Sequence, residues 1–120
     1  MTEEEQHDGR RESGLASAIS DAMIRLHRTH FGRGPANART VIAEDVVVCI
    51  LSDVFTAPER TLLNSGKEGV VRDTRLTYQR STQHEYVDAL ERLTGGAVTA
   101  FASAVTFDPD LAIEVFLLAE

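Results

Sequence analysis

The side chains best suited to binding chemistry are arginines, and they gather in the middle of the chain. Residues 25–80 hold nine basic and six acidic side chains, whereas residues 1–24 and 81–120 are both acidic. The planar guanidinium group of arginine matches the geometry of carboxylates and phosphates. The sequence therefore predicts a site for a small anion or an acidic partner protein, although pairing with acids of the flanking segments or of another subunit would also explain these arginines. The candidate ligand-binding residues are Gly32, Arg33, Gly34, Arg39, Arg60, Arg72 and Arg75.

The turn Gly32-Arg33-Gly34-Pro35 is the most suggestive part of this set. Glycine-rich turns bind anions when several backbone N–H groups converge. This turn is not a P-loop, because no Gly-Lys-Ser/Thr motif follows and the next segment is strand-like. The same residues can simply end a helix, since Gly32 favours the left-handed conformation and Pro35 prevents continuation. Both interpretations stay open.

No set of side chains has the types and spacing of a catalytic or metal centre. His27 and His30 are three residues apart, but no nearby acid or thiol completes a metal site, and solvated histidines at the end of a helix explain them. Cys49 lies in an apolar segment, where burial raises the pKa of a thiol and makes it unreactive. Asp108-Pro109-Asp110 is typical of a β-turn. We therefore predict no catalytic residue, no metal and no cofactor, and we do not expect an enzyme.

Helices and paired strands must position these side chains. Apolar residues at helical spacing predict helices, short apolar runs predict strands, and Thr56 with Glu59 three residues later predicts a capping box. The predicted helices cover residues 14–31, a short segment after Thr56, and residues 68–93; the predicted strands cover residues 38–43, 46–52, 98–107 and 111–118. The fold class is therefore α+β, a two-layer sandwich of order α-β-β-α-α-β-β. Its antiparallel four-stranded sheet carries the helices on one face.

The second and fourth predicted strands are apolar on both faces. Because two helices can cover only one face of the sheet, the other face should carry some of the apolar residues of these strands. We expect them among Val47, Cys49, Leu51, Phe116 and Leu118. An apolar sheet face is rarely left in water. The sequence thus predicts a homodimer, or a higher homo-oligomer, in which two sheets stack face to face.

Length, charge and composition limit the number of domains, the classes of partner and the location of the protein. A length of 120 residues predicts one domain, with residues 1–13 as a disordered acidic tail and residues 14–120 as the α+β domain. The net charge of −7 argues against general nucleic-acid binding. No apolar run approaches the roughly 18 residues of a membrane span. The acidic N-terminus does not resemble a signal peptide, so we expect a cytoplasmic location.

The order and spacing of several short motifs resemble the MpsC family over about residues 14–119. These motifs are Gly32-Arg33-Gly34-Pro35, Ala38-Arg39-Thr40, Asp45-Val46-Val47-Val48, Leu51-Ser52-Asp53-Val54-Phe55-Thr56, Glu59-Arg60-Thr61-Leu62, Gly66, Val71-Arg72-Asp73-Thr74-Arg75, Leu93-Thr94-Gly95, Asp108-Pro109-Asp110 and Glu114-Val115-Phe116-Leu117. The resemblance implies a small bacterial soluble domain, named after a Na+-translocating membrane-potential-generating system. It further implies an association with membrane proteins of cation transport and inorganic-carbon uptake, and it brings no catalytic residues.

The combined prediction is a non-enzymatic, cytoplasmic, homo-oligomeric domain that is accessory or regulatory to a membrane cation or inorganic-carbon transport system. It would bind a partner protein, such as a membrane transport protein, or a small anion through its arginines. One alternative is a single-stranded nucleic-acid-binding module built on the basic middle segment, although the KH-type Gly-x-x-Gly loop and exposed stacking aromatics are missing. The other alternative is an enzyme whose site lies at a dimer interface.

Overall fold

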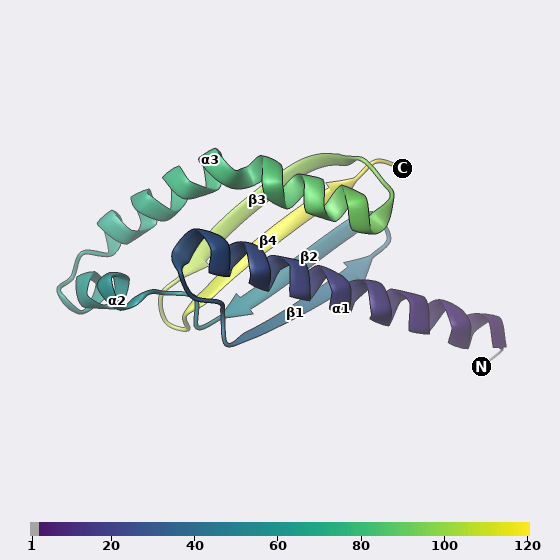
Figure 1. Cartoon of the computed structure of the whole chain (residues 1–120), viewed down its shortest axis with the longest axis horizontal. Helices are drawn as coiled ribbons and strands as arrows, with labels where there is room; N and C mark the ends of the chain where they lie inside the picture. The colour runs from purple at the N-terminus through teal and green to yellow at the C-terminus, as the bar shows by residue number, and fades with distance from the viewer. Residues whose placement is uncertain (1–2) are drawn as a thin grey trace.

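A computed structural model describes residues 3–120, with side chains from Glu12 onward. Its elements are helix α1 (Glu3–Phe31), strands β1 (Asn37–Ala43) and β2 (Val46–Ser52), helices α2 (Ala57–Asn64) and α3 (Glu68–Thr94), and strands β3 (Val98–Thr106) and β4 (Leu111–Leu118). This order confirms the predicted α-β-β-α-α-β-β arrangement (Figure 1).

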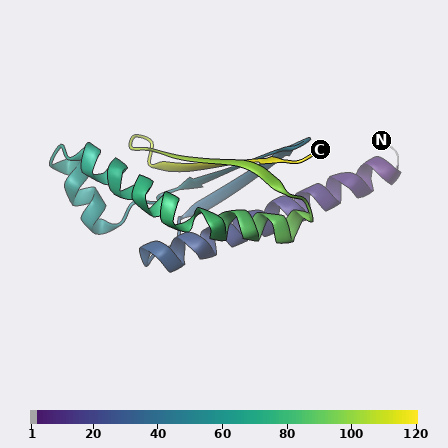
Figure 2. The same ribbon diagram turned by 90° about the horizontal axis from the view of Figure 1, so that it is seen from above.

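The four strands form one antiparallel sheet in the order β1-β2-β4-β3. Each hairpin pairs neighbouring strands, and the central pairing of β2 with β4 joins the two halves of the chain. Figure 2 shows α1 and α3 on the same side of the sheet. Helix α1 packs mainly on β1 and on α3, with a smaller contact to β2, and α3 also packs on β3. The predicted two-layer α+β sandwich with helices on one face is therefore confirmed.

Helix α1 begins at Glu3, well before the predicted start at residue 14. The sequence predicts a disordered tail over residues 1–13, whereas the structure continues the helix through residues 3–13; residues 1–2 lie outside the described part. This segment is rich in Glu, Gln and Arg, which have high helix propensity. The sequence nevertheless favours a tail here, because the segment lacks the apolar stripe that marks a packed helix. Its first turns extend past the end of the sheet (Figure 1).

The other helix ends, including the C-terminal end of α1, follow local chemical signals. Gly32 has a left-handed φ of 78°, and its N–H donates to the carbonyl of Arg28 at 3.0 Å. Thr56 and Glu59 form both hydrogen bonds of the predicted capping box at the start of α2. Gly95 ends α3 with a φ of 74°. Because each signal acts within a few residues, it can be recognised from sequence.

The core lies between the helices and one face of the sheet. Ile19 and Met23 of α1 and Leu90 of α3 are completely buried there. So are Val47, Cys49, Leu51 and Phe116, while Leu118 packs against the core. The prediction that some of these five strand residues lie on the opposite face is therefore wrong. Both sets of alternating residues are apolar in β2 and β4, so the pattern does not indicate which set the helices cover.

The face of the sheet away from the helices, here called the open face, carries the other set. Strand register places three successive rows across it: Arg39–Ile50–Ile113–Ala104, Val41–Val48–Val115–Ala102 and Ala43–Val46–Leu117–Ala100. Eleven of these twelve residues are apolar. Val41 and Leu117 are 41% and 39% exposed. An apolar second face thus exists, but it is built from different residues than predicted.

Candidate functional site

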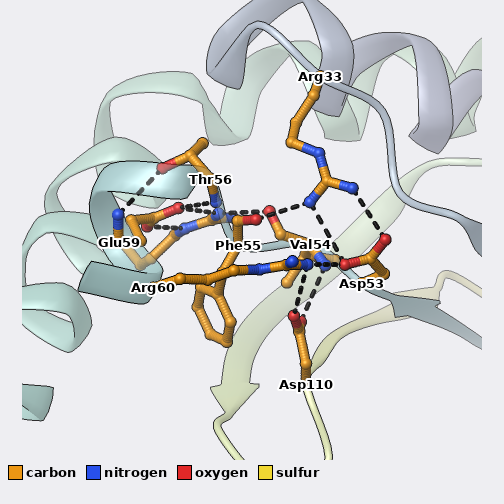
Figure 3. A network of polar contacts seen from close by, with 9 residues as sticks. Arg33, Asp53, Val54, Phe55, Thr56, Glu59, Arg60 and Asp110 are labelled. Carbon is orange, nitrogen blue, oxygen red and sulfur yellow. Dashed lines mark hydrogen bonds and ion pairs between the residues drawn. The ribbon is translucent and has the colours of Figure 1, made fainter. Parts of the chain in front are cut away.

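Asp53 is the centre of a polar cluster that stabilises the loop between β2 and α2 (Figure 3). Its backbone has a positive φ of 58°, which is uncommon for a residue other than glycine. Arg33 Nη2 donates to Asp53 Oδ2 at 2.8 Å, and Arg60 Nη2 donates to Asp53 Oδ1. Arg33 Nη1 also donates to the carbonyl of Phe55 at 2.6 Å. Two arginines from separate segments therefore hold this loop in place.

Asp110 joins the cluster from the turn between β3 and β4. Its Oδ1 accepts the N–H of Val54 at 2.8 Å, and its carbonyl accepts the N–H of Asp53 at 3.2 Å. Arg60 Nη2 lies 3.7 Å from Asp110 Oδ2. The charged groups of Asp53 and Arg60 are well exposed, so each ion pair contributes at most about 1 kcal/mol. The main effect of the cluster is to satisfy backbone groups of the loop.

Glu59 and Arg75 form a more deeply buried pair beside this cluster. Arg75 donates from Nε and Nη2 to the two oxygens of Glu59, each at 2.6 Å, and from Nη2 to the carbonyl of Val54 at 2.8 Å. Burial opposes ionisation of Glu59, but hydrogen bonds from Arg75 and from Thr56 outweigh burial and lower the pKa of its carboxyl group. Because this carboxylate also completes the cap of α2, it ties α3 to α2.

Aromatic rings complete the surroundings of Arg75. Its guanidinium carbon lies 3.8 Å from the centroid of the Phe31 ring and 5.2 Å from that of Phe55. Arginine stacks well on aromatic faces because its charge is delocalised over a plane. The carboxylate and the rings together explain how a charged side chain is buried here.

The structure brings together only part of the arginine set. Arg33, Arg60 and Arg75 converge on residues 53–59, where each contacts a carboxylate. Arg39 lies on the open face, and Arg72 lies on α3 with its guanidinium 4.8 Å from the centroid of the Phe107 ring. For Arg39 and Arg72, the side chains of residues 12–120 include no carboxylate within ion-pair distance. Ligand binding by these arginines stays a prediction.

The two glycines of the candidate set shape the turn after α1. Gly32 adopts the left-handed conformation that ends the helix. At Gly34, an added Cβ atom would lie 3.1 Å from Arg28 Nη2 and 3.3 Å from Ile24 Cγ2. A side chain at position 34 would therefore have to displace Arg28 or Ile24.

A pocket with different chemistry lies between α1, α3 and the inner face of β3 and β4. His27 Nε2 lies 3.5 Å from Glu114 Oε1, and both side chains are only 5% exposed. The pocket has a volume of about 30 Å³, and its walls include Tyr86, Phe101 and Ser103. A cavity of this size accommodates a water molecule or one small polar group. We call it the His27–Glu114 pocket.

The polar groups of this pocket are incompletely paired. A distance of 3.5 Å is long for a hydrogen bond between His27 and Glu114, and Glu114 Oε2 is buried without a partner among the described residues. Burial, and then the charge of Glu114, raise the pKa of Tyr86, so its phenol stays protonated. The pocket therefore offers a carboxyl oxygen, an imidazole and a phenol for hydrogen bonding with a ligand.

The sequence does not indicate this pocket, because the residues that line it are far apart in the chain. His27 was expected to be solvated, but it is buried, and its partner Glu114 lies 87 residues away. Glu114 did carry a signal: it occupies an inward position between Ala112 and Phe116 in an otherwise apolar strand. His30 lies outside the pocket, with Nε2 2.7 Å from Glu85 Oε2, although this contact lacks hydrogen-bond geometry.

The structure also describes Cys49, the side chains that could bind a metal ion, and the helices that could span a membrane. The pKa of Cys49 is raised to about 11, mainly by burial, as the sequence predicts for an unreactive thiol. Among the side chains of residues 12–120, no group of three or more His, Cys, Asp or Glu residues is arranged to hold a metal ion. Residues 3–120 include no helix with the length and apolar character needed to cross a membrane.

Comparison with known proteins places the chain in a family. No curated protein and no solved structure gives a significant match. A family model described as the Na+-translocating membrane potential-generating system (MpsC) matches residues 11–120. The match covers nearly the whole chain. The chain therefore belongs to the MpsC family.

Proposed function

We propose that this protein is a non-enzymatic, homodimeric accessory component of the Na+-translocating system after which its family is named. The observation that carries the proposal is the apolar open face of the sheet. The family description supports the link to a membrane system. In this proposal two copies stack through their open faces on the cytoplasmic side, and the helical faces remain available to a partner protein.

The size of the open face supports self-association. Four strands of about seven residues, with about 3.3 Å per residue along each strand and about 4.8 Å between strands, cover roughly 400 Å² in projection. Two copies would bury roughly 800 Å² before surface corrugation is counted, which approaches the roughly 1,000 Å² of a specific interface. Val48 and Val115 lie at the centre of this surface, in the middle of the three rows.

The edges of the open face also suit a second copy. Strand β1 has Arg39 near one end, and Glu44 follows its other end. A two-fold axis that runs parallel to the sheet and perpendicular to its strands would stack the two open faces. It would place each Arg39 near Glu44 of the second copy. At the opposite edge, Ala100, Ala102 and Ala104 have small side chains that permit close approach. This arrangement is isologous, as expected for a symmetric dimer.

Size-exclusion chromatography with light scattering tests the dimer. Wild-type protein should have twice the 13.2 kDa mass of one chain at micromolar concentration. Val48→Lys should give a folded monomer, because it places a charge at the centre of the proposed interface.

Val70→Lys is the matched control. Val70 is 50% exposed on α3, on the helical side of the molecule, so this variant should remain dimeric. Circular dichroism should show native helix content in both variants. A monomeric wild-type protein, or a dimer that withstands Val48→Lys, would contradict the proposal.

We also propose Arg39 and Arg72 as contacts for an acidic partner or a small anion. They are favoured over Arg33, Arg60 and Arg75 because internal carboxylates already pair with those three side chains. A partner that uses Arg72 would bind on the helical side, whereas one that uses Arg39 would bind at the edge of the open face.

Thermal unfolding with inorganic phosphate tests this second proposal. An anion that binds only the folded state raises the midpoint of unfolding. The increase should be smaller in Arg39→Ala or Arg72→Ala than in the wild type and in the control Arg92→Ala, which removes an exposed arginine at the far end of α3. An equal increase in all four proteins would count against both contacts.

A further inference from the structure

One oxygen of Glu114 has no hydrogen-bond partner among the described residues. Glu114 Oε2 is buried, and the one hydrogen-bond partner of Oε1 among the described residues is His27 Nε2, at 3.5 Å. Buried carboxyl oxygens are normally hydrogen-bonded, and leaving one unpaired is unfavourable. Glu114 is thus placed to accept an N–H or O–H group from a molecule that enters the pocket.

The cationic side chain nearest the pocket does not supply this donor. Arg75 lines the pocket, but its Nε and Nη2 atoms donate to Glu59 and to the carbonyl of Val54. Because Glu59 already balances the charge of Arg75, the charge preference of the pocket depends on the Glu114 carboxylate and on His27 beside it. A bound anion would be repelled by this carboxylate, whereas a cation would be attracted.

Aromatic rings form part of the wall of the pocket, and a cation that lies over such a ring face is attracted to it. The ring centroids of His27 and Tyr86 are 5.9 Å apart in an edge-on arrangement, and those of Tyr86 and Phe101 are 6.1 Å apart in a stacked one. Aromatic faces attract cations electrostatically within about 6 Å. Arg75 above the Phe31 ring already shows one cation held in this way.

A second cavity adjoins the pocket, and we infer that a ligand would enter through it. It lies between α3 and β3, has a volume of about 230 Å³, and shares Arg75, Gln79, Ser103 and Val105 with the His27–Glu114 pocket. Leu76 adds apolar surface to its lining, and Arg72 adds a second arginine beside Arg75. The cavity is smaller than the roughly 300–1,000 Å³ typical of drug-sized ligands, so it suits a molecule with a short carbon chain.

We propose that the His27–Glu114 pocket binds a small organic ammonium ion. The N–H group of the ligand donates to Glu114 Oε2, and its short apolar chain lies along Leu76 and Val105 in the cavity between α3 and β3. This site is on the helical side of the molecule. Its existence is therefore independent of dimer formation through the open face.

An NMR titration of ¹⁵N-labelled protein with n-butylammonium chloride tests the proposal. Sodium butyrate, which has a carboxylate in place of the ammonium group, is the matched ligand. Butylammonium should give saturable shifts at the amides of Gln79, Ser103 and Glu114, with a Kd of about 1–10 mM. Butyrate should bind at least about tenfold more weakly.

Two results of the titration would overturn the proposal. If butyrate binds as tightly as butylammonium, Glu114 does not set the charge preference of the pocket. If butylammonium gives no saturable shift at about 100 mM, a bound water molecule suffices to pair Glu114 Oε2.

Glu114→Gln tests the role of the carboxylate. This substitution keeps the shape of the side chain and removes its charge, so the Kd for butylammonium should rise at least about tenfold. Glu85→Gln is the control, because Glu85 contacts His30 outside the pocket, and its Kd should match that of the wild type. Unchanged affinity in a folded Glu114→Gln variant would overturn the proposal.

Leu76→Trp tests the route without altering a buried charge. Leu76 is 40% exposed, so a larger side chain there narrows the cavity while the core stays intact. The Kd for butylammonium should rise at least about fivefold. If Glu114→Gln does not fold, this variant decides the question, and unchanged affinity in Leu76→Trp would overturn the proposal.

Discussion

At the scale of single residues, two buried acid–base pairs behave differently. The Glu59–Arg75 pair is complete, with two hydrogen bonds of 2.6 Å between its members. The His27–Glu114 pair is incomplete, with a single contact of 3.5 Å and one unpaired oxygen. A complete pair stabilises the fold, whereas an incomplete one leaves hydrogen-bonding capacity for a ligand.

Removing the Glu59 charge should destabilise the protein. Glu59→Gln leaves Arg75 buried without its counter-ion and should lower the free energy of unfolding by about 3 kcal/mol. Urea denaturation measures this change. Asp88→Asn, an exposed substitution on α3, is the control and should change stability by less than about 0.5 kcal/mol. A loss of the same size in both variants would refute the role of the buried pair.

The same pair should make stability depend on pH. The pKa of Glu59 is lowered in the folded state, so its stabilising contribution is present above its ordinary pKa of 4.5 and is lost as the pH falls through the folded-state value. The difference in stability between wild type and Glu59→Gln should therefore shrink below pH 4.5. A difference that stays constant to lower pH would indicate that packing, not charge, causes the loss.

At the scale of elements, local signals determine where most helices begin and end. Gly95 shows this for α3, since its left-handed backbone lets its N–H donate to the carbonyl of Glu91 at 2.8 Å. Such a conformation is unfavourable for residues with a Cβ atom. The long N-terminal part of α1 is the exception, because its charged composition gives no packing signal.

Adjacent glycines after α3 allow a matched comparison. Gly95→Ala should lower the free energy of unfolding by about 1 kcal/mol, because φ is 74° there, although nothing lies within 4 Å of the added Cβ atom. Gly96→Ala should change it by less than about 0.5 kcal/mol, because the nearest atom would be at an ordinary 3.8 Å. Thermal or urea denaturation compares the two variants, and equal losses would show that the left-handed conformation is not the cause.

At the scale of the whole molecule, the sheet separates two surfaces with different properties. One face is covered by α1 and α3 and holds the core together with the His27–Glu114 pocket. The other is the apolar open face. If the proposed dimer forms, its midpoint of thermal unfolding should rise with protein concentration, and that of Val48→Lys should not. A wild-type midpoint independent of concentration would argue against the dimer.

How far the sequence predicts this protein depends on how far apart the interacting residues are. The capping box of Thr56 and Glu59 spans three residues, and the hairpin between β1 and β2 closes through Glu44 and Asp45, so both were predicted correctly. The covered face of β2 was assigned wrongly, because Val47 and Val48 are equally apolar and only the packing of helices distinguishes them. Arginine clustering was visible in sequence, but the partners of each arginine were not.

The sequence by itself determined the family, the order of elements and the helix ends other than the start of α1, because these depend on short motifs and on hydrophobic periodicity. Only the tertiary structure decided which charges meet. Glu114 contacts His27, which lies 87 residues away in the chain. Asp53 forms ion pairs with Arg33 and Arg60, which belong to two different segments. Such pairs form because the antiparallel sheet and its helices bring distant segments together, and no local pattern encodes that proximity.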